Sequence, residues 1–198
     1  MTPYYEHAGI TIYNCDCREI LPGLEPVDLV LTDPPYPDVL VEEYHYEDGL
    51  INSINGLGRK QFVFWSAKAD FPLDYSAIHI WDKKTGCASE YERIFERCGG
   101  KNWKVFRFYL LNSTVAANFH GELFTGHRSQ KPSKLIKKII QFDGGTGTIL
   151  DPFMGSGTTL VAAKQLNRRC IGIEIEERYC EIAASRLSQE VFDFGESK

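Results

Sequence analysis

Residues 148–166 read TILDPFMGSGTTLVAAKQL. The apolar start at 148–150 predicts a short buried strand, and residues 158–166 continue as a helix. Gly155 and Gly157 lie between the two and permit a tight turn with close approach of the backbone to a ligand. Because the helix begins directly after these glycines, free backbone amides there can bind a carboxylate or a phosphate. The stretch therefore predicts a strand–turn–helix unit that cradles a nucleotide-like ligand.

The spacing of the glycines narrows the class of ligand. A third glycine is missing, which argues against a standard nicotinamide dinucleotide site, and no Gly-Lys-Ser or Gly-Lys-Thr follows, which argues against a P-loop ATPase. A second strand-like run, CIGIE at 170–174, ends in Glu174. A carboxylate about twenty residues after such a turn usually binds ribose hydroxyls.

A second motif lies near the amino end, where the apolar run 27–32 leads into Asp33-Pro34-Pro35-Tyr36. The two prolines fix the backbone and lack amide hydrogens, so the neighbouring carbonyls can be left free to accept hydrogen bonds from an amine. Asp33 adds a second acceptor, and Tyr36 offers a ring face on which an unstacked base can lie. Read alone, the four residues are equally compatible with a proline turn after a strand. Together with the glycine turn they indicate methylation of an amino nitrogen.

In this order the two motifs resemble those of amino-group DNA methyltransferases that use S-adenosylmethionine, in the circularly permuted beta class. In that group the Asp-Pro-Pro-Tyr motif comes first, a recognition segment follows, and a Phe-x-Gly-Ser-Gly cofactor motif comes last. The resemblance spans roughly residues 9 to 187. Four further segments of the sequence agree with it, namely 14–17, 62–65, 78–83 and 127–132.

The resemblance implies a role for each motif residue. The catalytic residues would be Asp33, Pro34, Pro35 and Tyr36. The cofactor-binding residues would be Asp16, Cys17, Asp151, Phe153, Gly155, Ser156, Gly157, Thr158, Thr159 and Glu174. Asp at the first catalytic position points to the exocyclic N6 of a flipped-out adenine, because cytosine-N4 members more often carry Ser there. A cytosine-N4 enzyme, an RNA amine methyltransferase and an inactive cofactor-binding subunit remain as alternatives.

The expected fold is α/β, because strands alternate with helices along the chain. The resemblance implies a Rossmann-like methyltransferase fold, circularly permuted, with a mostly parallel seven-stranded sheet and helices on both faces. We expect strands near 10–13, 27–32, 61–65, 77–81, 105–111, 147–150 and 170–174, and helices near 47–57, 133–142, 158–167 and 176–188.

Charge is distributed unevenly along the chain. Residues 59–138 hold fifteen Lys and Arg against seven Asp and Glu, whereas the rest of the chain holds seven against twenty, and the whole chain has a net charge of −5. A basic stretch with interleaved aromatic residues is typical of a phosphate-binding face, although a solvated surface has the same composition. The residues we expect to contact DNA are Lys101, Lys104, Arg107, Arg128 and Lys131.

At 198 residues the chain suits a single methyltransferase domain over 1–198, with a short candidate target-recognition segment at about 99–126. No stretch approaches the roughly eighteen apolar residues of a membrane span, and no secretory signal is evident, so we expect a cytoplasmic protein. The six cysteines lack paired spacing and indicate reduced thiols without a metal site. The partner implied by the resemblance is double-stranded DNA, with a homodimer and a cognate restriction endonuclease as further candidates.

Overall fold

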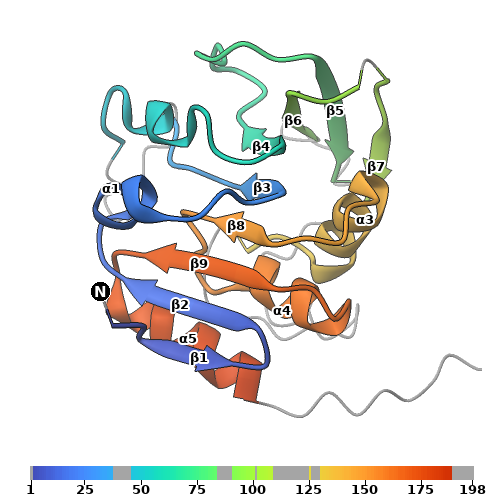
Figure 1. Ribbon diagram of the computed structural model, residues 1–198. Helices are drawn as coiled ribbons and strands as arrows, with labels where there is room; N and C mark the ends of the chain where they lie inside the picture. Colours follow the sequence, from blue (N-terminus) through green and yellow to red (C-terminus); the bar gives the residue numbers. More distant parts are fainter. Residues whose placement is uncertain are drawn as a thin grey trace, which may run out of the picture.

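A computed structural model describes residues 2–37, 46–83, 91–100, 102–108, 125 and 130–188. Within these residues nine strands form one sheet, in the order β1-β2-β9-β8-β3-β4-β6-β5-β7 (Figure 1). The strands are β1 (Tyr5–His7), β2 (Ile10–Asn14), β3 (Leu29–Thr32), β4 (Lys60–Trp65), β5 (Ala77–Asp82), β6 (Tyr91–Arg97), β7 (Val105–Arg107), β8 (Ile149–Asp151) and β9 (Cys170–Glu174). Most of the candidate recognition segment, and residues 109–111 of the strand expected there, lie outside the described residues.

The prediction of a mostly parallel seven-stranded sheet is wrong in strand number and in strand direction. The run β2-β9-β8-β3-β4 is parallel, but β1 pairs antiparallel with β2, and β6 pairs antiparallel with both β4 and β5. The strand β6 reads YERIFER, with a charged pair on each side of the apolar pair Ile94-Phe95, so its sequence does not look like a buried strand. Its carboxylates Glu92 and Glu96 are nevertheless buried, because each meets basic partners from other strands or loops.

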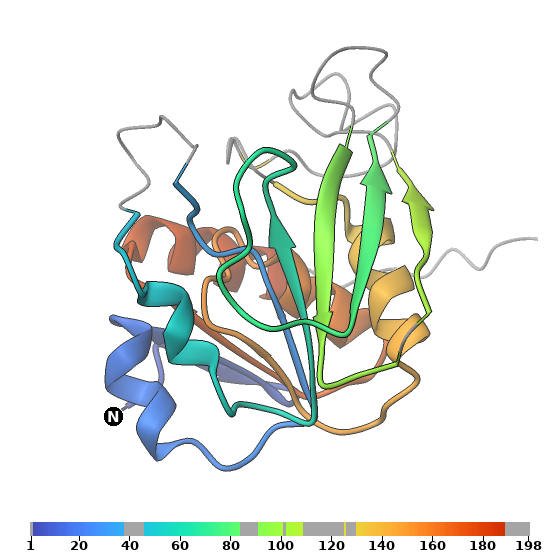
Figure 2. The same cartoon turned by 90° about the horizontal axis from the view of Figure 1, so that it is seen from above.

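Helices cover both faces of the sheet, as predicted. Side chains alternate between the faces along each strand. In β3, Leu29 and Leu31 pack toward the long helices, whereas Val30 packs toward the opposite face. One face carries α3 (Ser133–Asp143), α4 (Thr158–Gln165) and α5 (Glu177–Ser188); the other carries α1 (Cys17–Ile20) and two 3-10 turns, η1 (Leu21–Gly23) and η2 (Leu50–Ile54) (Figure 2). The helix expected at 47–57 is therefore only the short turn η2.

The run of parallel strands determines where the candidate functional site lies. Strands β2, β9, β8 and β3 point the same way, so their carboxyl ends meet at one edge of the sheet. The segment 33–36 follows β3, and the glycine turn follows β8. No helix among the described residues is long and apolar enough to cross a membrane.

Candidate active site

A cavity of about 240 Å³ lies at the carboxyl edge of the parallel strands. It brings together the loops after β2, β3, β8 and β9, which are far apart in the sequence. All four predicted catalytic residues line it, as do nine of the ten predicted cofactor residues. The exception is Gly157, at which an added Cβ would lie 2.6 Å from the Ala183 Cβ, so this glycine allows α4 to pack closely against α5.

Asp33 presents an acceptor at this cavity. Its Oδ1 is buried and has no hydrogen-bond partner among the residues that the structure describes, whereas its Oδ2 accepts a hydrogen bond from the Lys131 ammonium. Burial raises the pKa of the Asp33 carboxyl, and Lys131 opposes this shift. The Tyr36 ring packs against Trp65, with ring centroids 5.5 Å apart and planes tilted by 54°. The motif after β3 therefore places an acceptor and an aromatic ring at one cavity.

Lys131 belongs to a row of alternating charges. Its Nζ lies 3.3 Å from Glu92 Oε2, and Lys83 Nζ lies 2.6 Å from Glu92 Oε1. Burial alone lowers the pKa of Lys131, but the Asp33 and Glu92 carboxylates outweigh burial and hold that pKa well above its usual value. Burial likewise opposes ionisation of Glu92, yet Lys131 and Lys83 keep its pKa below the usual value. Lys131 and Glu92 therefore stabilise each other's charged forms.

This position corrects the expectation that Lys131 contacts DNA phosphates. Only 8% of its side chain is exposed, and two carboxylates surround its ammonium. A phosphate-binding lysine needs an accessible ammonium, whereas Lys131 lines the cavity from the start of α3. The sequence signal that could have revealed this role is the Lys131-Pro132 pair, because segment 127–132 resembles the family segment that opens the helix before the cofactor strand.

Asp151 ends β8 deep beneath the cavity. Its Oδ1 accepts hydrogen bonds from the Thr32 hydroxyl at 2.7 Å and from the Phe153 amide at 3.2 Å. Burial raises its pKa to about 6, although the hydrogen bonds from Thr159, Thr32 and Phe153 oppose this shift. The carboxylate therefore orders the start of the glycine turn rather than facing solvent.

Glu174 ends β9 and also organises backbone amides. Its Oε2 accepts from the Gly155 amide and its Oε1 from the Glu176 amide, both at 2.9 Å. Since each carboxylate oxygen has two lone pairs, both oxygens can still accept a hydroxyl from a ligand. Burial raises the pKa of this carboxyl, and the amide hydrogen bonds oppose the shift. The glycine turn and the start of α5 thus share one carboxylate anchor.

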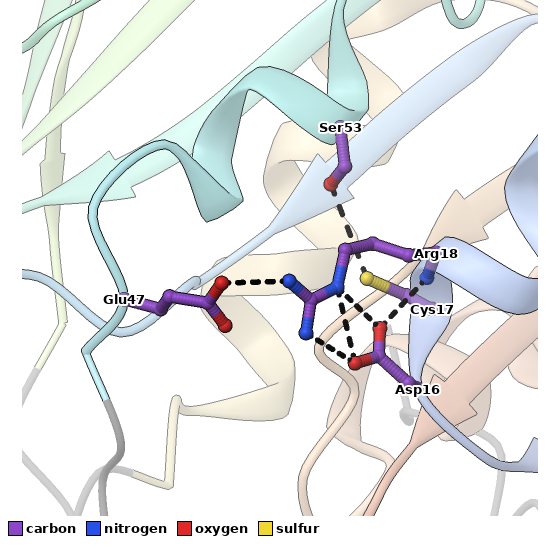
Figure 3. A network of polar contacts seen from close by, with 5 residues as sticks. All are labelled: Asp16, Cys17, Arg18, Glu47 and Ser53. Carbon is purple, nitrogen blue, oxygen red and sulfur yellow. Dashed lines mark hydrogen bonds and ion pairs between the residues drawn. The ribbon is translucent and has the colours of Figure 1, made fainter.

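Figure 3 shows a polar network of five residues, of which all but Ser53 line the cavity. Asp16 caps α1 by accepting from the Arg18 amide at 2.9 Å, and the Arg18 guanidinium joins Asp16 at 2.6 Å to Glu47 at 2.8 Å. The hydrogen bonds from Arg18 lower the pKa of Asp16. Cys17 Sγ lies 3.9 Å from Ser53 Oγ, and burial raises the pKa of the Cys17 thiol.

Several lining residues were not predicted. Arg18 and Glu47 belong to the network just described, Thr32 holds Asp151, and Tyr179 lines the cavity. Tyr179 stands five residues beyond Glu174, the acidic end of β9, so its place at the first turn of α5 was the available signal. For Glu47 the sequence carried no signal, because its contact with Arg18 spans 29 residues.

Two other residues of the predicted DNA face, Lys104 and Arg107, lie at the edge strand β7. Arg107 is 65% exposed, and its Nε lies 3.2 Å from Asp82 Oδ2. Lys104 is exposed and its Nζ lies 4.8 Å from the Phe142 ring centroid, beside the strongly exposed Trp103. Lys101 and Arg128 lie outside the described residues.

The charge of the cavity wall selects for cations. Six carboxylates line it, against two cationic side chains; the carboxylates belong to Asp16, Asp33, Glu47, Asp151, Glu174 and Glu176, and the cations are Arg18 and Lys131. A ligand that carries positive charge is favoured over a phosphate-rich one at such a wall. The charged side chains of this wall fit S-adenosylmethionine, which carries a sulfonium and an ammonium group.

Two solved structures share this architecture. The crystal structure of an M1.HpyAVI–SAM complex superposes with a TM-score of 0.63 and 26% sequence identity, covering 91% of this chain and 100% of that one. The cytosine-N4-specific PvuII DNA methyltransferase superposes with a TM-score of 0.70, covering 96% of this chain and 90% of that one, and at 15% identity it shows the fold alone.

The sequence comparison then defines the family. A family model described as DNA methylase (N6_N4_Mtase) matches residues 53–185, so the chain belongs to this family of amino-group DNA methyltransferases. The type II methyltransferase M2.DpnII of Streptococcus pneumoniae is 52% identical over 111 residues, 55% of this chain and 39% of the relative. M2.LlaDCHI of Lactococcus lactis subsp. cremoris is 38% identical over 110 residues, 54% of this chain and 39% of the relative. The chain matches about two-fifths of the length of these relatives.

Proposed function

We propose that this chain transfers a methyl group from S-adenosylmethionine to the exocyclic N6 of a flipped-out adenine in DNA. The observation that carries the proposal is the buried Oδ1 of Asp33, which has no hydrogen-bond partner among the described residues and belongs to a residue lining the cavity that also contains the glycine turn. A buried acceptor without a donor is costly, so its place beside a ligand cavity favours a ligand donor such as an amine.

The acidic wall fits the proposed cofactor. In this assignment Asp16 and Cys17 would lie at its adenine, Glu174 at its ribose, and the turn from Phe153 to Thr159 at its methionine end. When bound, S-adenosylmethionine supplies a methyl group that is already electrophilic. The protein therefore has to place the amine in line with that methyl group and to exclude water.

The residues after β3 would act on the amine. The adenine amino lone pair is delocalised into the ring, so hydrogen bonds accepted by Asp33 and by the Pro34 carbonyl would favour a more tetrahedral nitrogen. The same acceptors would stabilise the positive charge that develops on this nitrogen. Stacking on Tyr36 would offset part of the few kcal/mol that base extrusion costs.

The DNA backbone would follow the basic edge of the sheet. Lys104 and Arg107 are exposed there, beside the exposed ring of Trp103. Positive side chains interleaved with aromatic rings favour contact with a phosphate backbone. Asp at the first catalytic position favours adenine over cytosine, by analogy with the family.

The test is product analysis. The purified chain is incubated with S-adenosylmethionine and unmethylated duplex DNA, the DNA is digested, and the nucleosides are identified by mass spectrometry. We expect N6-methyladenine. Methylcytosine would contradict the base assignment and leave the reaction class intact, whereas methylation of RNA but not DNA would contradict the substrate class.

The variant Asp33→Ala tests the catalytic assignment. We expect no detectable methyl transfer and an unchanged dissociation constant for S-adenosylmethionine by calorimetry, because Asp33 would meet the amine and not the cofactor. Retained turnover in Asp33→Ala would refute the catalytic assignment.

A further inference from the structure

Lys131 is a donor placed directly beside the acceptor of the proposed reaction. Its ammonium hydrogen bonds to Oδ2 of Asp33, while Oδ1 of the same carboxylate has no partner among the described residues. An ammonium carries three N–H groups; Asp33 accepts a hydrogen bond from one of them, and Glu92 Oε2 lies 3.3 Å away as an ion-pair partner. Both Asp33 and Lys131 line the cavity. A ligand there meets an acceptor and a donor side by side.

Glu92 reaches the cavity only through Lys131. It lies on β6, outside the cavity wall, and is held between Lys131 at 3.3 Å and Lys83 at 2.6 Å. The rings of Phe64 and Trp81 enclose the Lys131 ammonium, with centroids 5.1 Å and 5.8 Å away. These contacts hold the ammonium in one place.

A buried row of this kind needs a reason other than stability. Removing several charges from water costs free energy that their mutual attraction often fails to recover, and apolar replacements of similar volume are commonly neutral or stabilising. The aromatic walls show that this region can be packed with apolar side chains. A role in ligand recognition accounts for the charges.

Building on the function proposed above, we infer that Lys131 donates a hydrogen bond to the ring nitrogen next to the target amine, and that Glu92 positions Lys131 for this contact. Adenine presents its amine beside the acceptor N1, and cytosine presents its amine beside the acceptor N3. Guanine and thymine present a carbonyl beside a ring N–H, which is the opposite pattern. Asp33 and Lys131 together therefore select bases with an amine and reject bases with a carbonyl, as expected for readout of a flipped base along its Watson–Crick edge.

The test replaces one atom of the base and one side chain of the protein. Duplexes carry adenine, 1-deazaadenine or 7-deazaadenine at the methylated position; 1-deazaadenine lacks the ring nitrogen next to the amine, and 7-deazaadenine keeps it. We expect the wild-type kcat/KM to fall about 10- to 100-fold on 1-deazaadenine, the usual effect of losing a charged hydrogen bond, and much less on 7-deazaadenine. In Lys131→Met the ratio between adenine and 1-deazaadenine should approach one.

The quantity compared is the ratio of kcat/KM on adenine to kcat/KM on 1-deazaadenine, taken within each protein variant. This ratio is needed because 1-deazaadenine also changes the intrinsic reactivity of the amine. A wild-type ratio that Lys131→Met leaves unchanged would refute the contact while the proposed function stands. No product from the wild type on any DNA would instead refute the proposed function itself. If the methylated base is cytosine, 3-deazacytosine takes the place of 1-deazaadenine.

Glu92→Gln tests the positioning role and does not remove a donor to the base. We expect kcat to fall about tenfold and the dissociation constant of S-adenosylmethionine to stay the same. Glu96→Gln is the matched control, because Glu96 lies on the same strand and is also buried. Its carboxylate pairs with His79 at a distance of 2.8 Å, and neither residue lines the cavity. Equal losses of kcat in the two variants would refute a specific role for Glu92.

Lys131→Arg retains the charge and the donors. Partial recovery of the kcat/KM ratio between adenine and 1-deazaadenine, relative to Lys131→Met, supports the contact. No recovery in a folded protein counts against it.

Discussion

The hydroxyl of Thr32 donates a hydrogen bond of 2.7 Å to Oδ1 of Asp151, across 119 residues of sequence. Thr32 ends β3 and Asp151 ends β8, so this bond joins the strand before the Asp-Pro-Pro-Tyr motif to the strand before the glycine turn. Both side chains are buried. The two motifs of the candidate site are therefore fixed to each other beneath the cavity.

Loss of the hydrogen bond between Thr32 and Asp151 should lower the stability of the folded protein. In Thr32→Val the buried Asp151 carboxylate loses a donor, and we expect the free energy of unfolding to fall by about 1–3 kcal/mol. Urea denaturation measures the change. Thr32→Ser keeps the hydroxyl and should recover most of the loss; equal destabilisation in both variants would show that packing of the methyl group, and not the bond, is responsible.

The raised pKa of Asp151 predicts a pH dependence of stability. Its value of about 6 exceeds the ordinary 3.8, so the folded state binds the proton more tightly than the unfolded state between about pH 4 and pH 6. The contribution of Asp151 to the free energy of unfolding is therefore highest below pH 4. As the pH rises through 6, this contribution falls by on the order of 3 kcal/mol.

Asp151→Asn isolates this effect, because asparagine keeps an acceptor oxygen and does not titrate. Urea unfolding of both proteins is compared at several pH values from 4 to 7.5, without cofactor. We expect the wild type to lose stability relative to Asp151→Asn across this window. Parallel curves would contradict the raised pKa.

Alanine substitutions at Gly157 and Gly144 distinguish destabilisation by steric crowding from destabilisation by backbone strain. Both have positive φ, at 77° and 70°, but an added Cβ meets Ala183 at Gly157 and nothing within 4 Å at Gly144. We expect Gly144→Ala to cost about 1–2 kcal/mol from the left-handed conformation alone, and Gly157→Ala to cost about 2–5 kcal/mol because overpacking adds to it. Denaturation curves give both values.

The same pair tests the cofactor turn. Calorimetry should show weaker binding of S-adenosylmethionine to Gly157→Ala and unchanged binding to Gly144→Ala, because only Gly157 lies between the turn and α4. Equal affinity in the two variants would mean that the turn does not depend on close packing of α4 against α5.

The basic edge of the sheet predicts a change in salt dependence. Replacing Lys104 and Arg107 by Ala should make the slope of log affinity for DNA against log salt concentration less negative by about one for each lost phosphate contact. Arg169→Ala is the control, because Arg169 is exposed at the amino end of β9, opposite the cavity. A slope that changes equally in the control would contradict a localised DNA face.

Local patterns in the sequence predicted much of this protein. The strand before the glycine turn, the turn itself and α4 follow from turn chemistry and apolar periodicity within about twenty residues, and so does β3 with the motif after it. Thirteen of the fourteen residues predicted for catalysis and cofactor binding line one cavity. Parallel strands explain this, because motifs that follow such strands meet at the same edge.

The tertiary structure alone decided the rest. It decided that β6 is a buried antiparallel strand, since the burial of Glu92 and Glu96 depends on basic partners from other segments. It also decided that Lys131 lies beside Asp33, 98 residues away, and not on the surface with the other basic residues. A charged side chain looks the same in sequence whether water or a carboxylate surrounds it, and only the folded chain determines which of the two it meets.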